Sequence, residues 1–186
     1  MKVFKTIDLS PFCNHKLVYE RLPDEDGEYG LDNICVLKED FKFKERETID
    51  GAEFAFSLSD FDNVVCDRQR IRIGERAERL HVIGFGYWGD IFEDFQLVYD
   101  DDSAAYLRVA LPDWSHAGKG DVVSQFYLRD ADVRPARVVL SSGSQRHLIY
   151  FHYCTCDVDS QKPIREIVLP DNMFMHVFAI SLEKNA

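Results

Sequence analysis

FEDFQLVYDDDSAAYLRVAL, residues 92–111, is the stretch of sequence that decides the fold class. Its two arms, 92–99 and 104–111, have the length of β-strands and contain many of the aromatic and β-branched residues that strands favour. The four residues between them read DDDS, and short acidic and hydroxyl side chains suit a tight turn. The stretch therefore predicts an antiparallel β-hairpin.

Strand signals of the same kind dominate the rest of the chain. Short β-branched and aromatic runs are interrupted by Gly, Pro, Asn or Asp, and no stretch carries an apolar helical stripe bounded by capping residues. The last run is mostly apolar, which indicates a central, covered strand. The sequence predicts an all-β fold, a two-sheet antiparallel β-sandwich, with strands at 3–9, 34–37, 52–58, 63–66, 69–73, 79–85, 91–99, 104–111, 122–128, 136–140, 146–154, 164–169 and 174–182.

The chain shows no division into parts. It contains no internal repeat, no low-complexity tract and no Pro-rich linker, and 186 residues exceed the common domain size only modestly. We expect one domain over residues 1–186, with two smaller domains as the alternative. Residues 20–33 and 38–51 are charged and weakly periodic, so 20–51 is expected to form surface loops or an insertion that supplies little of the core.

Composition excludes several classes of protein. A hydrophobic fraction of 46% argues against disorder, and a net charge of −11 disfavours nucleic acid and anionic membranes as partners. No apolar run is long enough for a signal peptide or a membrane-spanning helix, so a cytoplasmic protein without a cofactor is expected. An odd number of scattered cysteines predicts reduced thiols and no disulfide framework at Cys13, Cys35, Cys66, Cys154 and Cys156.

The string GFGYWG, residues 84–89, satisfies the G-x-G-x-x-G pattern directly after a predicted strand. In a dinucleotide site those glycines open a helix whose N-terminus faces the pyrophosphate. Here the residues that follow read as another strand, and bulky Tyr87 and Trp88 occupy the inner positions. The string therefore predicts a wide β-turn that presents two aromatic rings.

That turn is the best candidate for a ligand site in the sequence. Exposed aromatic rings on loops stack on the apolar faces of sugars, while neighbouring carboxylates and amides bond the hydroxyl groups. The competing interpretation is that each Trp packs in the core or against a loop, because Trp is usually well buried. The predicted ligand-binding residues are Tyr87, Trp88, Asp90, Asp113, Trp114 and His116.

A metal site is the second hypothesis. On a regular strand His152, Cys154 and Cys156 share one face, and Cys13 with His15 could complete a set of soft ligands. Ligands two residues apart on a strand are roughly 6 to 7 Å apart, which is wide for one ion. We therefore predict that these residues have a structural role and bind no metal. A metal site at His152, Cys154 and Cys156 is the less favoured alternative.

No catalytic motif stands out in the sequence. It lacks a G-x-S-x-G elbow, an H-E-x-x-H helix and a Walker loop, and the linear spacing selects no cysteine–histidine pair. Acidic pairs are too common in so acidic a chain to be informative, and the turn 100–102 lacks the ligand spacing of a calcium loop. An enzyme is less favoured than a binding protein.

Several stretches after residue 60 carry a family resemblance. They are 62–71 (DNVVCDRQRI), 79–84 (RLHVIG), 95–99 (FQLVY), 111–114 (LPDW), 167–172 (IVLPDN) and 175–180 (MHVFAI). Over residues 60–182 the chain resembles the jelly-roll accessory domains of bacterial carbohydrate-active enzymes, which are galactose-binding-like β-sandwiches. The resemblance implies a jelly roll whose first and last strands pair, and a role linked to carbohydrate, but no binding residues. Asp67 and Arg68 stand where the pattern expects a small residue or a glycine turn.

Three classes of function remain open from the sequence. The leading one is a non-catalytic carbohydrate-binding or carbohydrate-linked interaction module. The second is a structural or assembly protein that dimerises, or docks on a partner enzyme, through an aromatic patch. The third is an enzyme that depends on a metal or on a Cys/His site.

Overall fold

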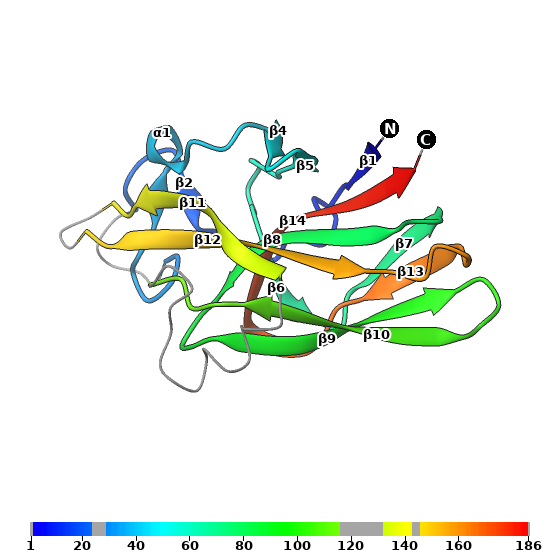
Figure 1. Ribbon diagram of the computed structural model, residues 1–186. Helices are drawn as coiled ribbons and strands as arrows, with labels where there is room; N and C mark the ends of the chain where they lie inside the picture. Colours follow the sequence, from blue (N-terminus) through cyan, green and yellow to red (C-terminus); the bar gives the residue numbers. More distant parts are fainter. Residues whose placement is uncertain (1, 24–28, 116–131, 143–145, 186) are drawn as a thin grey trace.

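The computed structural model describes residues 2–23, 29–115, 132–142 and 146–185, and these form an all-β molecule (Figure 1). The larger sheet has the strand order β1-β14-β8-β12-β11, with β6 also paired to β14. Its strands are antiparallel, as the sequence predicts. They are β1 (Lys2–Ile7), β14 (Asp171–Asn185), β8 (Arg79–Gly86), β12 (Leu148–Asp157), β11 (Asp132–Leu140) and β6 (Val64–Asp67).

The second sheet contains the hairpin that the sequence indicates. Its four antiparallel strands have the order β10-β9-β13-β7. In the hairpin Ala104 pairs with Val98 and Leu111 pairs with Ile91, so both predicted arms and the turn between them are confirmed. The strands are β10 (Ala104–Leu111), β9 (Ile91–Tyr99), β13 (Ile164–Val168) and β7 (Arg70–Glu75).

The two ends of the chain lie side by side in the larger sheet (Figure 1). β1 pairs with β14 from Lys2 opposite Asn185 to Ile7 opposite Ile180, which is the pairing that the resemblance implies. The interior of β14 is buried between β1 and β8, so the expectation of a central, covered last strand is confirmed. The strand predicted at 122–128 lies outside the described residues.

Apolar side chains fill both faces of the larger sheet. Between the two sheets, Leu80 and Val82 of β8 pack with residues of β9, β10 and β13. On the outer face, Phe85, Phe151 and Phe178 form an aromatic layer with neighbours from the first third of the chain. Alternation along the strands produces this division, because successive side chains point to opposite faces.

Residues 20–51 contribute to the outer aromatic layer, so the expectation that they supply little of the core is wrong. The side chains of Leu31, Phe41, Phe43 and Ile49 are buried, and the Phe43 ring lies 5.0 Å from that of Phe151. Each apolar residue is isolated among charged ones, and tertiary packing alone places it on the sheet. The covering elements are β2 (Val18–Tyr19), β3 (Val36–Leu37), α1 (Lys38–Phe41), β4 (Arg46–Ile49) and β5 (Ala52–Ala55).

The glycine string at 84–89 belongs to β8 and the turn that follows it. β8 ends at Gly86 and β9 begins at Ile91, so residues 87–90 turn the chain from the larger sheet into the second one. Close backbone approach explains two of the glycines: a Cβ atom on Gly84 would lie 2.3 Å from the His176 carbonyl oxygen, and one on Gly86 would lie 2.3 Å from that of Gly89. Among the residues described, no helix has the length and apolar character needed to cross a membrane.

Candidate functional site

The structure brings five of the six predicted ligand-binding residues together at one end of β8. Gly86 bridges to Asp113 in parallel, and the Trp114 N–H donates to the Gly86 carbonyl oxygen (2.9 Å). This places the turn that contains Tyr87, Trp88 and Asp90 beside the segment that follows β10. The sixth predicted residue, His116, lies outside the described residues.

The two predicted acids brace the turn. The Asp113 carboxylate accepts hydrogen bonds from the N–H of Gly89 (2.6 Å) and the N–H of Ser115 (2.9 Å), and its side chain is buried. The Asp113 N–H in turn donates to the Asp90 carboxylate (2.7 Å). Both side chains stabilise the backbone, so they hold the aromatic turn in one conformation.

The two tryptophans differ in their surroundings. Trp88 is 74% exposed at the tip of the turn, whereas Trp114 is half-buried against the outer aromatic layer. Trp88 also has φ of 68°, in the left-handed region that bulky residues rarely adopt. The left-handed conformation costs an L residue about 1–2 kcal/mol, so the surrounding structure imposes it on Trp88. Trp114 instead fits the competing interpretation of a packing residue.

Tyr87 connects this turn to a pocket. Its ring contacts that of Trp88 edge-on, with centroids 6.0 Å apart, and its hydroxyl is hydrogen-bonded to the Asp32 carboxylate. Burial and this hydrogen bond raise the pKa of Tyr87 to about 12. The phenol therefore stays protonated at neutral pH and can keep donating to Asp32.

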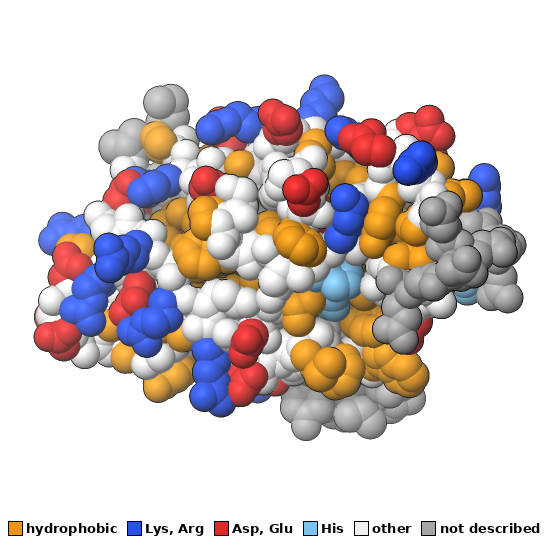
Figure 2. Space-filling view, turned by 180° about the vertical axis from the view of Figure 1, so that it is seen from behind, with side chains coloured by type: hydrophobic (Ala, Val, Ile, Leu, Met, Phe, Trp, Pro, Cys, Tyr) orange, Lys and Arg blue, Asp and Glu red, His pale blue; other side chains and the backbone are white. Residues whose placement is uncertain are grey.

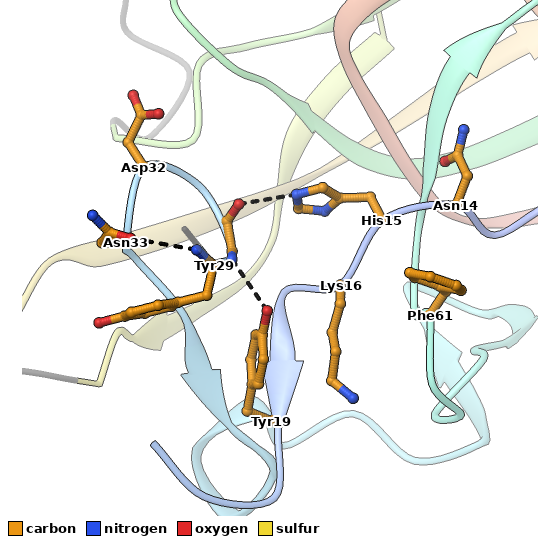
Figure 3. Close-up of a pocket in the computed structure, with 9 residues that line it drawn as sticks. Asn14, His15, Lys16, Tyr19, Tyr29, Asp32, Asn33 and Phe61 are labelled. Carbon is orange, nitrogen blue, oxygen red and sulfur yellow. Dashed lines mark hydrogen bonds between the residues drawn. The ribbon is translucent and has the colours of Figure 1, made fainter. Parts of the chain in front are cut away.

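The pocket next to this turn was not predicted from the sequence (Figure 3). It has a volume of about 440 Å³, within the range of small-molecule sites. Its walls come from the segment 14–19, the turn 29–33 and the residue before Asp62, so no single motif contains it. The side chains that line it are Asn14, His15, Lys16, Tyr19, Tyr29, Asp32, Asn33 and Phe61.

Aromatic rings and hydrogen-bonding groups share the pocket wall. Tyr19 and Tyr29 meet edge-on at 6.1 Å, and Phe61 is 49% exposed at the rim. The Lys16 ammonium nitrogen lies 5.1 Å from the centroid of the Tyr19 ring, within the range of a cation–π contact. Asn33 lies on the opposite side of the pocket in Figure 3. The wall thus combines apolar ring faces with an ammonium and an amide, and the Asp32 carboxylate points away from the rings in Figure 3.

The turn 29–33 has a strained backbone that points Asp32 toward Tyr87. Asp32 and Asn33 have φ of 45° and 65°, and Gly30 has φ of 56°. The Asn33 N–H donates to the Tyr29 carbonyl oxygen (2.9 Å), and the Tyr29 N–H donates back to the Asn33 side-chain oxygen (3.3 Å). Asp and Asn tolerate the left-handed region better than other L residues, which explains their presence in this turn.

A buried polar network connects the lining residue His15 to the interior of the molecule. The Asn63 side-chain oxygen lies 2.9 Å from His176 Nδ1, and its nitrogen lies 3.1 Å from His15 Nδ1. An amide oxygen only accepts and an amide nitrogen only donates, so His176 carries its proton on Nδ1 and His15 on Nε2, which donates to the Gly30 carbonyl oxygen (3.0 Å). Burial lowers the pKa of His176 to about 3, so the network is neutral.

Asp62 attaches the pocket wall to the sandwich. Its carboxylate accepts from the N–H groups of Leu17 (3.0 Å) and Val18 (2.8 Å), between the wall residues Lys16 and Tyr19. It also accepts from the Asn63 amide (2.8 Å). Burial raises the pKa of Asp62 to about 6 despite these hydrogen bonds. Nothing in the linear sequence distinguishes this carboxylate from the 32 other acidic residues among the chain's 33.

The residues of the metal alternative, His152, Cys154 and Cys156 with Cys13 and His15, do not come together as one group of three or more among the described residues. His152 Nε2 lies 3.3 Å from the Asp113 carbonyl oxygen, and His15 belongs to the network with Asn63. Within the described parts of the chain, no group of three or more His, Cys, Asp or Glu side chains is placed to hold a metal ion. The acidic turn after β9 gives no support to a calcium site either, because Asp101 pairs with Lys162 and Asp102 with Arg165.

Comparison with known proteins adds no family to this description. No protein-family model matches the chain, and no curated protein matches its sequence. The resemblance to galactose-binding-like domains stays a prediction, and the site has to be interpreted from its own chemistry.

Proposed function

We propose that this protein is a non-catalytic carbohydrate-binding module whose site consists of the pocket and the exposed Trp88 beside it. The observation that carries the proposal is the convergence of aromatic rings with separate polar groups at one open pocket. Tyr19, Tyr29 and Phe61 line it together with Lys16 and Asp32. Sugars have apolar C–H faces and hydroxyl edges, and this wall offers a partner to each.

One face of the molecule exposes apolar side chains among charged ones. Figure 2 shows the face opposite to that of Figure 1, on which hydrophobic side chains lie around a histidine and are flanked by charged ones. Trp88 is linked to the pocket because its neighbour Tyr87 bonds Asp32. We propose that a sugar longer than the pocket extends from it toward the exposed Trp88 ring.

The titratable His and Asp side chains near the site already have hydrogen-bond partners within the protein, and this favours binding over catalysis. Both ring nitrogens of His15 have partners, and Asp113 is bonded to backbone N–H groups. Asp32 accepts from a Tyr87 phenol that keeps its proton. These groups hold the site in shape, and an acid–base pair would need one of them poised to exchange a proton with the substrate.

Tryptophan fluorescence with a panel of mono- and oligosaccharides tests the proposal. We expect a saturable change that Trp88→Phe reduces and that Tyr19→Ala or Lys16→Ala abolishes, since Trp114 remains as a reporter. Tyr106→Ala is the matched control, because Tyr106 is 66% exposed on β10 and lies on the hairpin instead of the pocket. If no sugar produces a response, or if the control loses binding equally, the proposal is wrong.

Assembly through an aromatic patch is a second candidate, favoured by one observation. Met173 and Phe174 are exposed, and the Phe174 carbonyl oxygen accepts from the Tyr87 N–H (2.8 Å), which places both residues next to the Trp88 turn. An exposed apolar group of this kind often contacts another protein. Sedimentation velocity tests it: a dimer that Met173→Asp dissociates and Tyr106→Asp leaves intact would support assembly.

The cysteines bear on the compartment in which the protein works. All five cysteines are free, and Cys35, Cys66 and Cys154 are buried in the core. Reduced thiols of this kind are typical of a reducing compartment. We therefore propose a cytoplasmic location, which fractionation of cells that express a tagged chain would test.

A further inference from the structure

Lys16 brings a positive charge into the pocket. Its side chain is half-buried, and in Figure 3 it lies between those of Tyr19 and Phe61. The ammonium group contacts the Tyr19 ring and forms no ion pair with a carboxylate in the part of the chain that the structure describes. Because the neighbouring rings exclude part of the surrounding water, an anion that reaches this ammonium is held more strongly than at an exposed lysine.

Three acidic side chains around Lys16 are engaged with other groups. Glu20 pairs with Lys38 (2.5 Å). The buried Asp62 carboxylate accepts from two backbone N–H groups and one side-chain amide. Asp32 is hydrogen-bonded to a phenol and points away from the rings in Figure 3. The charge of Lys16 is therefore left to a ligand.

The side-chain acceptors of the pocket wall already receive hydrogen bonds from the protein. The Asn14 side-chain oxygen accepts from a backbone N–H of β6 (2.8 Å), and that of Asn33 accepts from the Tyr29 N–H (3.3 Å). His15 Nδ1 accepts from the Asn63 amide (3.1 Å). These groups have little left to offer to the hydrogens of a ligand.

The Tyr19 phenol adds a second donor beside the ammonium. Its oxygen accepts from the Gly30 N–H (3.2 Å), which leaves its hydrogen to donate. Burial raises the pKa of Tyr19, so the phenol keeps that hydrogen at neutral pH. The wall thus offers a positive charge and donors, and it suits a ligand that carries acceptors and a negative charge.

We propose that the ligand of this pocket is an acidic sugar, a uronic acid whose carboxylate pairs with Lys16, an assignment that rests on the carbohydrate-binding function proposed above. A uronic acid differs from its neutral sugar only at C6, where a carboxylate replaces the hydroxymethyl group. It therefore keeps the apolar face that lies on Tyr19 or Phe61 and adds the charge that Lys16 lacks. The net charge of −11 repels anions at long range, but at physiological ionic strength this repulsion is screened beyond about 8 Å, so the local ammonium dominates.

Isothermal titration calorimetry with matched sugars tests the assignment. The pairs are galacturonic acid with galactose and glucuronic acid with glucose, and the methyl ester of galacturonic acid keeps the acyl group without its charge. We expect each acid to bind at least about tenfold more tightly than its neutral counterpart, because a hydrogen bond between charged groups is stronger than a neutral one. Added salt should weaken the binding of the acids and leave that of the neutral sugars unchanged.

Two lysine variants locate the charge that is responsible. Lys16→Gln keeps a hydrogen-bond donor and removes the charge, so it should abolish the preference for the acids. Lys44→Gln is the matched control, because it changes the net charge equally and Lys44 lines a separate pocket. The preference should remain in this control.

The outcomes separate the acidic ligand from the carbohydrate-binding function. If acids and neutral sugars bind equally well, or if Lys44→Gln also loses the preference, the acidic ligand is wrong and the carbohydrate-binding function stands. If none of these sugars binds, both proposals are wrong. The comparison of galacturonic acid with its methyl ester needs only the wild-type chain, so it decides the question even if Lys16→Gln fails to fold.

Discussion

Trp88 combines an exposed ring with a strained backbone, so substitutions there separate stability from binding. Trp88→Ala removes the ring and keeps the strain, because any L residue with φ of 68° pays the steric penalty of the left-handed region. Trp88→Gly removes both. The difference in stability between the Gly and Ala variants therefore measures the free-energy cost of the strained backbone, separately from the loss of the ring.

The structure sets the expected magnitudes. With 74% of the side chain exposed, Trp88 buries roughly 60 Å². At about 25 cal/mol per Å², its truncation to Ala lowers the free energy of unfolding by no more than about 1.5 kcal/mol. The left-handed conformation costs an L residue about 1–2 kcal/mol, and the greater chain entropy of unfolded Gly offsets about 0.5–1 kcal/mol. Trp88→Gly should therefore be more stable than Trp88→Ala by about 0.5–1 kcal/mol.

Urea denaturation followed by far-ultraviolet circular dichroism measures this difference. With a slope of about 2 kcal/mol per M, the Gly variant should have its midpoint about 0.3–0.5 M above that of the Ala variant. In the sugar titration both variants should lose the contribution of the ring equally. A Gly variant less stable than the Ala variant would refute the strain, and a loss above about 3 kcal/mol in the Ala variant would refute the exposure of the ring.

Two further predictions concern the core and the buried histidine network. Phe41→Ala should lower the free energy of unfolding by about 3–5 kcal/mol in urea denaturation, because the buried Phe41 ring packs on Phe151. The control Phe61→Ala removes an exposed ring and should lower it by less than about 1 kcal/mol. Similar losses in both variants would contradict the placement of 38–51 in the core. Burial lowers the pKa of His176 to about 3, so the unfolded chain takes up a proton at a higher pH than the folded one. The resulting stabilisation is fully present above pH 6.5, and the free energy of unfolding falls by up to about 1.4 kcal/mol per pH unit as the pH is lowered toward 3. The raised pKa of Asp62 has the opposite effect between about pH 4 and 6. The measurement is therefore the slope of the free energy of unfolding against pH, compared between wild type and His176→Gln. Equal slopes in the two proteins would contradict a neutral buried His176.

Most strands were predictable because their signal is local. Alternation with a period of two residues is visible along residues 92–111, and the turn chemistry fixes the register of that hairpin without reference to the rest of the chain. The segment 20–51 lacked such a signal. Phe41 and Phe43 stand among charged residues, and only the apolar outer face of the larger sheet determines that they are buried.

The candidate site was predictable only in part, for a related reason. Glycines around Tyr87 and Trp88 indicated a turn that presents rings, and the structure has that turn. The same reasoning placed Asp113 among the ligand contacts, and its bonds to backbone N–H groups show a bracing role that depends on a segment 24 residues from Gly89. Composition alone could not distinguish a bracing carboxylate from a binding one.

The sequence by itself determined the all-β class, the hairpin at 92–111, the covered last strand and the aromatic turn, since each depends on the side chains of neighbouring residues. Only the tertiary structure decided the pocket, whose wall combines Lys16, Tyr19, Asp32 and Phe61 from separate loops. It also decided that Asn63 contacts both His15, 48 residues before it in the chain, and His176, 113 residues after it. Contacts of this kind arise when the sheet brings distant strands together, and no pattern along the chain records which loops will then face one another.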